Sequence, residues 1–330
     1  MSAIKYINLT IRPATAADVP QLAAWWNDGK VMAHAGFPLG LGISEAEVAA
    51  GLSDGSLIIE ENGLPIGECN FRPAGDRAAE IGIKICEASA QNRGLGKIIL
   101  SLLIRRLFDN GFEKIVLDTN PENHRACRVY EALGFKMLRI NADSWRDQLG
   151  RLQSSTDYKL IENNFVDFSH IHTPRLLLRP FAADDLAQLH EIFSDPETME
   201  HIEPPFTLEK TAQFLHSFCI ERGGALACVH KESGKMIGYV LFKATEPDIY
   251  EIGWIFNRRF WRNGYAYEAC SALIRRAFER LGAEEIFAET NDSQKSLPLM
   301  EKLGMSYVGL ENGMHLCRIK RKDYENNRNT

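Results

Sequence analysis

Two patterns of apolar and polar residues alternate along this chain. Apolar residues at every second position predict strands, and apolar residues at every third or fourth position predict amphipathic helices. In the first half, strands are predicted at a short segment ending in Arg12-Pro13 and then at 56–71, 78–85, 114–119, 135–141 and 156–162. Helices are predicted at 15–27, 44–53, 94–110 and 122–132. The segment 56–71 is predicted as a hairpin that turns at Asn62-Gly63.

The second half repeats this order of elements. The stretch "EIGIKI" at 80–85 returns as "EIGWIF" at 251–256, and "TIRPATAADVPQL" is echoed by "LLRPFAADDLAQL". Further matching positions lie 170 residues apart: Gly94 with Gly264, Arg105-Arg106 with Arg275-Arg276, and Leu133-Gly134 with Leu303-Gly304. An internal repeat of this length predicts two related units.

Each unit has hairpin strands followed by alternating helices and strands, which predicts an α/β fold with a mixed sheet. A length of 330 residues also favours two domains of ordinary size. We place the first domain at 1–165, a linker at 166–172 within "ENNFVDFSHIHTP", and the second domain at 173–330.

Composition narrows the class of protein. Hydrophobic residues at 45% and charged residues at 25% are typical of a soluble globular chain. A net charge of −6 provides no general attraction to nucleic acid or to an anionic membrane, so neither is expected as a partner. The first residues show no leader, and no segment is apolar enough to cross a bilayer, so a cytoplasmic location is expected. The seven cysteines include no CxxC pair, which predicts reduced thiols and no metal site.

The stretch "QNRGLGK" at 91–97 places glycines and cations directly before the apolar run of the predicted long helix. A glycine turn leading into a helix leaves backbone N–H groups free at the positive end of the helix dipole, where anions bind. The alternative is that Gly94 and Gly96 only make a tight connection. Recurrence of the segment in both units favours phosphate binding, with Arg93 and Lys97 adding charge. The chain contains neither the P-loop pattern nor the complete dinucleotide pattern.

The segment 91–96 resembles the Q/R-x-x-G-x-G/A pyrophosphate loop of the GCN5-related N-acetyltransferases (GNAT). "NHRACRVYEALGF" at 123–135 is similar to a second, more specific motif of that family. The resemblance spans nearly the whole chain and implies two tandem GNAT-like domains that bind acetyl-coenzyme A. It implies cofactor contacts in the first unit by the amides of two strand residues and by the loop and helix residues: Ile83, Ile85, Gln91, Asn92, Arg93, Gly94, Leu95, Gly96, Lys97 and Asn123.

The second unit resembles the branch that includes the ribosomal-protein-alanine acetyltransferases, through "RLLLRPF", "FWRNGYAYEA" and "MEKLGM". The cofactor contacts implied there are Ile255, Arg262, Asn263, Gly264, Tyr265 and Ala266. Three positions depart from the family pattern: Arg262 replaces the middle glycine, Ser293 replaces the helix asparagine, and Met300 aligns with Tyr130. The second unit is therefore either a second acyl-CoA site with another acceptor preference or a degenerate partner.

Acetyl transfer from a thioester to an amine needs a base, a polarised carbonyl and a proton for the thiolate. Glu80 is the candidate base, with Glu87 as the alternative, and Tyr130 is the candidate acid. Because Glu251 repeats Glu80, a structural salt bridge is the competing interpretation of that glutamate. A core aromatic is the competing interpretation of Tyr130.

The acceptor pocket is less determined by the sequence. Trp26 and Phe37 lie in the segment where the family's substrate-shaping loop falls and could line an acceptor pocket, although core packing is the commoner role of aromatic residues on an amphipathic helix. Small polyamines, aminoglycoside-like amines and protein N-termini all remain compatible with the sequence. A coenzyme A-binding sensor or protein-docking module without turnover is the alternative to an enzyme, and the oligomeric state is left open.

Overall fold

The computed structural model describes residues 1–328 and divides them into two compact units. The first comprises Met1–Ile4 with Leu9–Ser169, and the second comprises Lys5–Asn8 with the chain from His170 onward. Within residues 1–328 no helix combines the length and the apolar character needed to cross a bilayer.

The first sheet has eight strands in the order β1-β2-β3-β4-β5-β6-β8-β7. Its strands are β1 (Ile4–Tyr6), β2 (Leu9–Pro13), β3 (Ser56–Glu61), β4 (Leu64–Pro73), β5 (Ala78–Ile85), β6 (Lys114–Thr119), β7 (Lys136–Arg146) and β8 (Leu152–Ile161). Its helices are α1 (Val19–Asn27), α2 (Gly29–Met32), α3 (Glu45–Gly51), α4 (Leu95–Asp109) and α5 (His124–Ala132). From β2 to β8, neighbouring strands are antiparallel except for β5 and β6, so the predicted mixed sheet is confirmed.

Local chemistry explains most of these bounds. Asn62 and Gly63 both have positive φ, at 52° and 76°, as a tight turn between β3 and β4 requires. Ser44 caps α3 by accepting from the Glu47 amide, and the Glu47 carboxylate accepts from the Ser44 amide in return. The predicted hairpin and the predicted helix are both confirmed.

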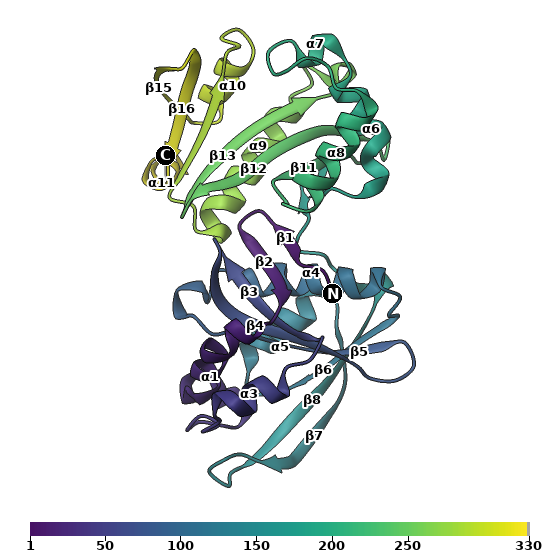
Figure 1. Cartoon of the computed structure of the whole chain (residues 1–330), viewed down its shortest axis with the longest axis vertical. Coiled ribbons are helices and arrows are strands. Elements are labelled where there is room, and N and C mark those ends of the chain that lie inside the picture. Colours follow the sequence, from purple (N-terminus) through teal and green to yellow (C-terminus); the bar gives the residue numbers. More distant parts are fainter. Residues whose placement is uncertain (329–330) are drawn as a thin grey trace. The chain divides into compact units, whose positions relative to one another are not determined.

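Helices cover both faces of the first sheet (Figure 1). α1 and α3 pack on one face around a cluster that includes Val19, Leu22, Trp25, Val48 and Ile58. α4 crosses the opposite face, and most of its apolar side chains are buried. This arrangement leaves the carboxyl ends of β5 and β6 between two layers of helix.

The closing hairpin of the first unit is longer than the sequence predicted. Strands were expected at 135–141 and 156–162, whereas β7 and β8 span Lys136–Arg146 and Leu152–Ile161. β7 is an edge strand whose side chains are mostly exposed on both faces, so its added part carries no alternation of apolar and polar residues. Ion pairing such as Arg139 Nε to Asp157 Oδ2, at 2.6 Å, helps to hold the two strands together.

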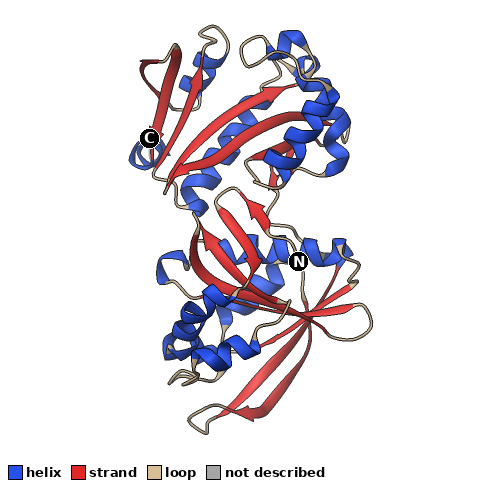
Figure 2. Ribbon diagram, in the orientation of Figure 1, coloured by secondary structure: helices blue, strands red, loops and turns tan. Residues whose placement is uncertain are grey.

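The second unit repeats the architecture (Figure 2). Its sheet has the order β15-β16-β14-β13-β12-β11-β10-β9. Its strands are β9 (Ile171–His172), β10 (Leu176–Pro180), β11 (Ala225–His230), β12 (Met236–Glu246), β13 (Ile249–Phe256), β14 (Glu285–Thr290), β15 (Ser306–Glu311) and β16 (Met314–Lys320). Its helices are α6 (Leu186–Phe193), α7 (Pro196–Met199), α8 (Leu208–Phe214), α9 (Tyr265–Arg276), α10 (Ser296–Lys302) and α11 (Arg321–Arg328).

Both units use one ion pair to anchor the first helix to the sheet. Arg12 on β2 donates two hydrogen bonds of 2.7 Å to Asp18, and Arg179 on β10 binds Asp185 at 2.7 and 2.8 Å. The Arg12 guanidinium lowers the pKa of Asp18 to about 2. This repeated bidentate contact explains why the Arg-Pro ending of the strand and the following aspartate recur in the sequence.

Each of the seven cysteines is a free thiol, and six of them are buried. Burial raises the pKa of Cys86 to about 12, so this thiol stays protonated and unreactive near neutral pH. The cysteines therefore serve as small core residues.

Candidate cofactor and catalytic site

The centre of the first sheet opens where β5 and β6 separate. The two strands pair only between Ala78–Glu80 and Lys114–Val116, although β5 continues to Ile85 and β6 to Thr119. Beyond Glu80, the peptide groups of β5 that point toward β6 have no strand partner. Ile83 and Ile85, predicted to hold the thioester carbonyl, lie in this free part.

The second sheet opens at the same place. β13 pairs with β14 only between Ile249–Glu251 and Glu285–Phe287, and Ile255 lies in the free part of β13. The opening is therefore a shared feature of the two units.

The glycine segment places free amides beside the opening of the first unit. Asn92 and Gly94 have left-handed backbone conformations, with φ of 61° and 82°, and α4 begins at Leu95 without a side-chain cap. Within residues 1–328 the amides of Gly94, Leu95 and Gly96 donate to no protein acceptor. Gln91 holds the segment against β5 by donating to the Ile85 carbonyl at 2.9 Å. Converging free amides at a helix start form an anion-binding site.

The cations of the segment have protein partners. The Arg93 guanidinium donates two hydrogen bonds to Glu61 on β3, at 2.7 and 2.8 Å, and so ties the loop to the sheet. The Lys97 ammonium lies 4.8 Å from the centre of the Phe168 ring. The predicted contacts of Arg93 and Lys97 with phosphate remain predictions.

Arg125 is a cation near the loop that the sequence interpretation missed. Its guanidinium lies 3.4 Å from the Gln91 side-chain oxygen and 3.3 Å from that of Asn92, and the side chain is exposed. The signal in the sequence was weak, because Arg125 occupies a variable position of the 123–135 motif.

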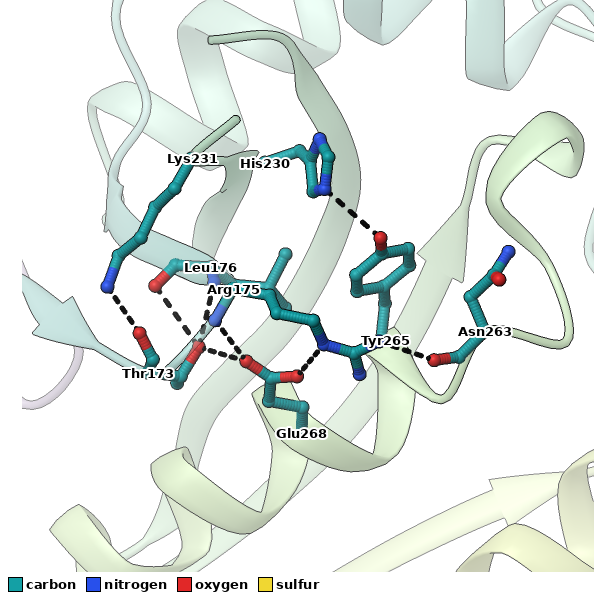
Figure 3. Close-up of polar contacts among 8 residues, drawn as sticks. All are labelled: Thr173, Arg175, Leu176, His230, Lys231, Asn263, Tyr265 and Glu268. Carbon is teal, nitrogen blue, oxygen red and sulfur yellow. Dashed lines mark hydrogen bonds and ion pairs between the residues drawn. The ribbon is translucent and has the colours of Figure 1, made fainter. Parts of the chain in front are cut away.

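The loop of the second unit has the same backbone. Arg262 and Gly264 have φ of 61° and 76°, α9 begins at Tyr265, and the amides of Gly264, Tyr265 and Ala266 have no acceptor within residues 1–328. Arg175 fastens this loop, because its guanidinium donates to the Asn263 carbonyl at 2.9 Å and lies 4.4 Å from the centre of the Tyr265 ring (Figure 3).

The first turn of α9 contains an acidic residue, Glu268, whereas the first turn of α4 contains none. Glu268 accepts from the Thr173 hydroxyl at 2.5 Å, the Arg175 amide at 2.8 Å and the Arg175 guanidinium at 2.7 Å (Figure 3). Burial opposes ionisation, yet these bonds together lower the pKa of Glu268, so the carboxylate is charged at neutral pH. Its charge is matched by Arg175 within the same network.

α5 positions Tyr130. The Asn123 side chain caps this helix by accepting from the Ala126 amide at 3.2 Å. Tyr130 is buried, packs against Phe135 and Tyr158, and has no hydrogen-bond partner for its hydroxyl within residues 1–328. Burial raises the pKa of Tyr130 to about 12, so the phenol is protonated at neutral pH. Met300 is equally buried in the second unit and offers no such proton.

Charged side chains line the α1 face of the first sheet across the opening. Glu80 pairs with Arg72 at 2.6 Å, and Asp118 on β6 lies opposite Asp157 on β8. The Asp118 side chain is accessible to solvent; nevertheless desolvation by its surroundings raises its pKa, and the carboxylates of Glu80 and Asp157 raise it further. Asp118 is thus a second acidic residue beside Glu80, and the sequence interpretation did not include it.

The alternative interpretation of Glu80 also finds support, because Glu251 pairs with Lys243 on the neighbouring strand at 2.8 Å. The ion pair is therefore common to both units. Glu87, the other candidate base, accepts from the Trp25 indole at 2.8 Å and so connects α1 to the end of β5.

Comparison with known proteins identifies both units. A family model described as an acetyltransferase (GNAT) domain matches residues 8–136 and 175–306. An uncharacterized N-acetyltransferase, YnaD of Bacillus subtilis strain 168, is 32% identical over 143 residues, which cover 42% of this chain and 84% of that protein.

Two solved structures are similar to a little under half of this chain. A GNAT-family acetyltransferase from Bacillus anthracis is 26% identical and covers 46% of this chain and 99% of its own, with a TM-score of 0.44. A ribosomal-protein-alanine N-acetyltransferase from Brucella melitensis is 20% identical and covers 46% of this chain and 98% of its own, with a TM-score of 0.41. This chain belongs to the GNAT family, as an acetyl-CoA-dependent N-acetyltransferase built from two such domains in tandem.

Proposed function

We propose that the first unit transfers the acetyl group of acetyl-CoA to a primary amine by direct attack. The amine nitrogen bonds to the thioester carbon, the carbon–sulfur bond breaks, and the thiolate departs. Glu80 takes the proton released by the amine, directly or through a water, and Tyr130 supplies a proton to the sulfur. The observation that supports this best is that free amides at the start of α4 and a separated strand pair occur together.

Placement of the cofactor follows from the same two features. The pyrophosphate binds the amides of Gly94, Leu95 and Gly96, where the helix dipole favours negative charge. The pantetheine then extends along the free part of β5, and the carbonyl oxygen accepts from amides near Ile83 and Ile85. These donors are fixed before the reaction begins, which is how preorganised N–H groups stabilise a developing oxyanion.

Tyr130 can donate a proton to the departing sulfur because burial raises the pKa of both groups. A phenol with a pKa of about 12 is a weak acid, and proton transfer to a thiolate in water would be uphill. In a desolvated site, however, burial raises the pKa of the thiol as well. The neutral Tyr130 hydroxyl can therefore donate its proton to the sulfur as negative charge develops there. Aromatic packing holds the ring in place.

The second unit is the better candidate for a coenzyme-binding module without turnover. It keeps the opening and the loop, but Met300 stands where Tyr130 supplies a hydroxyl. This substitution removes the proton donor while leaving the features proposed to bind the coenzyme.

Release of thiol from acetyl-CoA in the presence of a panel of amines tests the proposal. We expect Tyr130→Phe and Glu80→Gln each to lower kcat on the order of 100-fold, because each removes a proton-transfer group. Affinity for coenzyme A, measured by calorimetry, should stay unchanged. Glu251→Gln serves as the matched control and should leave kcat unaltered. Full turnover by Tyr130→Phe would exclude the assigned acid, and failure of the wild-type chain to acetylate any amine would exclude the function.

A further inference from the structure

Arg125 brings a positive charge to the start of the glycine segment from a different strand. It lies in the first turn of α5, the helix that follows β6, whereas the segment of residues 91–97 follows β5. Its guanidinium donates to the side-chain oxygens of Gln91 and Asn92. Because β5 and β6 separate beyond Glu80, Arg125 spans the opening near the carboxyl ends of both strands.

The charge of Arg125 is not matched by an anion of the protein. Its two contacts measure 3.4 and 3.3 Å and end on uncharged amide oxygens, whereas Arg93 binds the Glu61 carboxylate at 2.7 and 2.8 Å. No carboxylate of residues 1–328 forms an ion pair with Arg125, and the side chain is exposed. A guanidinium binds a phosphate through two parallel N–H groups, so a phosphate can replace both amide oxygens with a stronger contact.

The second unit repeats this charge. At the spacing of 170 residues that relates the two units, Lys295 aligns with Arg125, and Trp261 aligns with Gln91. The Lys295 ammonium lies 5.0 Å from the centre of the Trp261 ring, and the side chain is exposed. Within the described residues no carboxylate forms an ion pair with it. Both units thus place an unmatched cation against the first residue of the loop.

The cations within the loops themselves are not repeated. Each of them aligns with an uncharged residue of the other unit: Arg93 with Asn263, Lys97 with Tyr267, and Arg262 with Asn92. If both units bind the same cofactor, a charge that recurs at one position is the better candidate for a contact with it. Arg125 and Lys295 occupy that position.

Coenzyme A offers two kinds of phosphate to such a cation. The diphosphate is the group proposed above to bind the amides of Gly94, Leu95 and Gly96, and a further phosphate is attached to the 3′ oxygen of the ribose. The pantetheine leaves the diphosphate along the free part of β5, so the ribose leaves it in the other direction. Arg125 lies on that side, beyond the carboxyl ends of β5 and β6. The 3′-phosphate is a monoester that carries nearly two charges at neutral pH, and the loop amides do not neutralise it.

We infer that Arg125 binds the 3′-phosphate of coenzyme A in the first unit, and that Lys295 has the same role in the second. This inference rests on the placement of the diphosphate in the proposed function. Arg125 determines specificity for the cofactor and takes no part in acetyl transfer, because it lies at the end of the coenzyme opposite the thioester. It distinguishes coenzyme A from molecules with the same pantetheine arm and no 3′-phosphate.

Calorimetric titration with coenzyme A and with 3′-dephospho-coenzyme A tests the inference. The full chain carries Ala266→Glu, which places a carboxylate at the second loop, so that binding to the first unit dominates the titration. This chain should bind coenzyme A about tenfold more tightly than the dephospho form. Adding Arg125→Ala should abolish the preference by weakening the binding of coenzyme A alone. Arg125→Glu should reverse the preference, because a carboxylate repels the 3′-phosphate.

Arg128→Ala is the matched control. Arg128 is an exposed arginine about one turn further along α5, and its counterpart in the second unit is Pro298. The affinities for both ligands should stay unchanged in this variant. High salt should reduce the preference of the chain that retains Arg125, because salt screens the contact between exposed charges.

Two results would overturn the inference while the proposed function stands. One is equal affinity for the two ligands in the chain that retains Arg125. The other is an equal loss of affinity for both ligands in Arg125→Ala, which would place this residue at the diphosphate. Failure of the first unit to bind coenzyme A at all would overturn the proposed function, and the inference with it.

The second unit is tested in the same way. Lys295→Ala in a chain that carries Gly96→Glu should remove the preference of the second unit for coenzyme A over the dephospho form. A preference that survives this substitution would overturn the assignment of Lys295.

Discussion

At the scale of single residues, the phosphate loop depends on backbone conformation more than on side chains. Gly94 and Gly264 share a left-handed conformation, which costs other residues about 1–2 kcal/mol. Two residues earlier, Asn92 and Arg262 have the same φ of 61° although their side chains are unrelated. Asparagine tolerates this region well, whereas an arginine is strained there. Because the conformation persists despite that strain, we infer that the amides are what both units preserve.

Gly96 permits a cleaner test of the loop than Gly94. Its φ is not positive, and an added Cβ would meet only the Ile85 side chain at 3.8 Å. Gly96→Ala should therefore retain coenzyme affinity, and Ala266 already occupies this position in the second unit. Gly96→Glu should weaken binding at the first unit about tenfold, because a carboxylate would face the phosphates. Calorimetry at low and high salt measures both variants, and equal affinities would argue against phosphate at these amides.

At the scale of elements, the sequence predicted the segments with strong periodicity or clear turn chemistry. The strand at 114–119, the hairpin at Asn62-Gly63 and the helix that begins after Gly94 were all found as expected. The tip of the β7–β8 hairpin was not predicted, because it is held by hydrogen bonds between residues more than a hundred positions apart, such as Gln148 and Gly40. Contacts of this kind leave no periodic pattern.

The same limit applied to the candidate site. The glycine loop and Tyr130 belong to contiguous motifs and could be recognised in the sequence. Asp118 and Arg125 matter only because the fold brings them beside Glu80 and Asn92, respectively. Strand pairing brings Asp118 beside Glu80, and the position of α5 brings Arg125 beside Asn92; residue spacing reveals neither.

The anchor between the first strand and first helix predicts a pH dependence of stability. The pKa of Asp18 falls from its ordinary 3.8 to about 2 in the folded state. Its contribution is therefore fully present above about pH 4 and is lost as the pH falls through about 2. Asp18→Asn should lower the free energy of unfolding of the first unit by about 2 kcal/mol at pH 7 and by progressively less below pH 4.

Denaturant unfolding of the full chain, followed between pH 2 and pH 7, measures this effect. Asp54→Asn, an exposed aspartate in the same unit, is the control and should change little at any pH. A penalty for Asp18→Asn that stays constant over this range would show that packing, and not charge, connects Asp18 to Arg12.

At the scale of the whole molecule, the two units share the features proposed to bind the cofactor and differ in those proposed to act on it. Both contain a separated strand pair and a helix whose first amides are free. Only the first unit has Tyr130, and its closing hairpin is the longer of the two. Duplication followed by divergence of the reactive and acceptor-facing residues accounts for this difference, because the loop geometry requires only a backbone conformation while catalysis requires particular side chains.

The binding features that the two units share predict the number of coenzyme molecules that the chain binds. We expect one molecule of coenzyme A per unit, because the Glu268 carboxylate beside the second loop is matched by Arg175 and so does not repel phosphate strongly. Calorimetric titration of the wild-type chain should reach two per chain, and Gly96→Glu should weaken the first-unit event about tenfold while leaving the other unchanged. Arg175→Ala should unmask the charge of Glu268 and weaken the second-unit event. A stoichiometry of one, with an affinity that Gly96→Glu lowers, would mean that the Arg175–Glu268 network closes the second loop to the coenzyme.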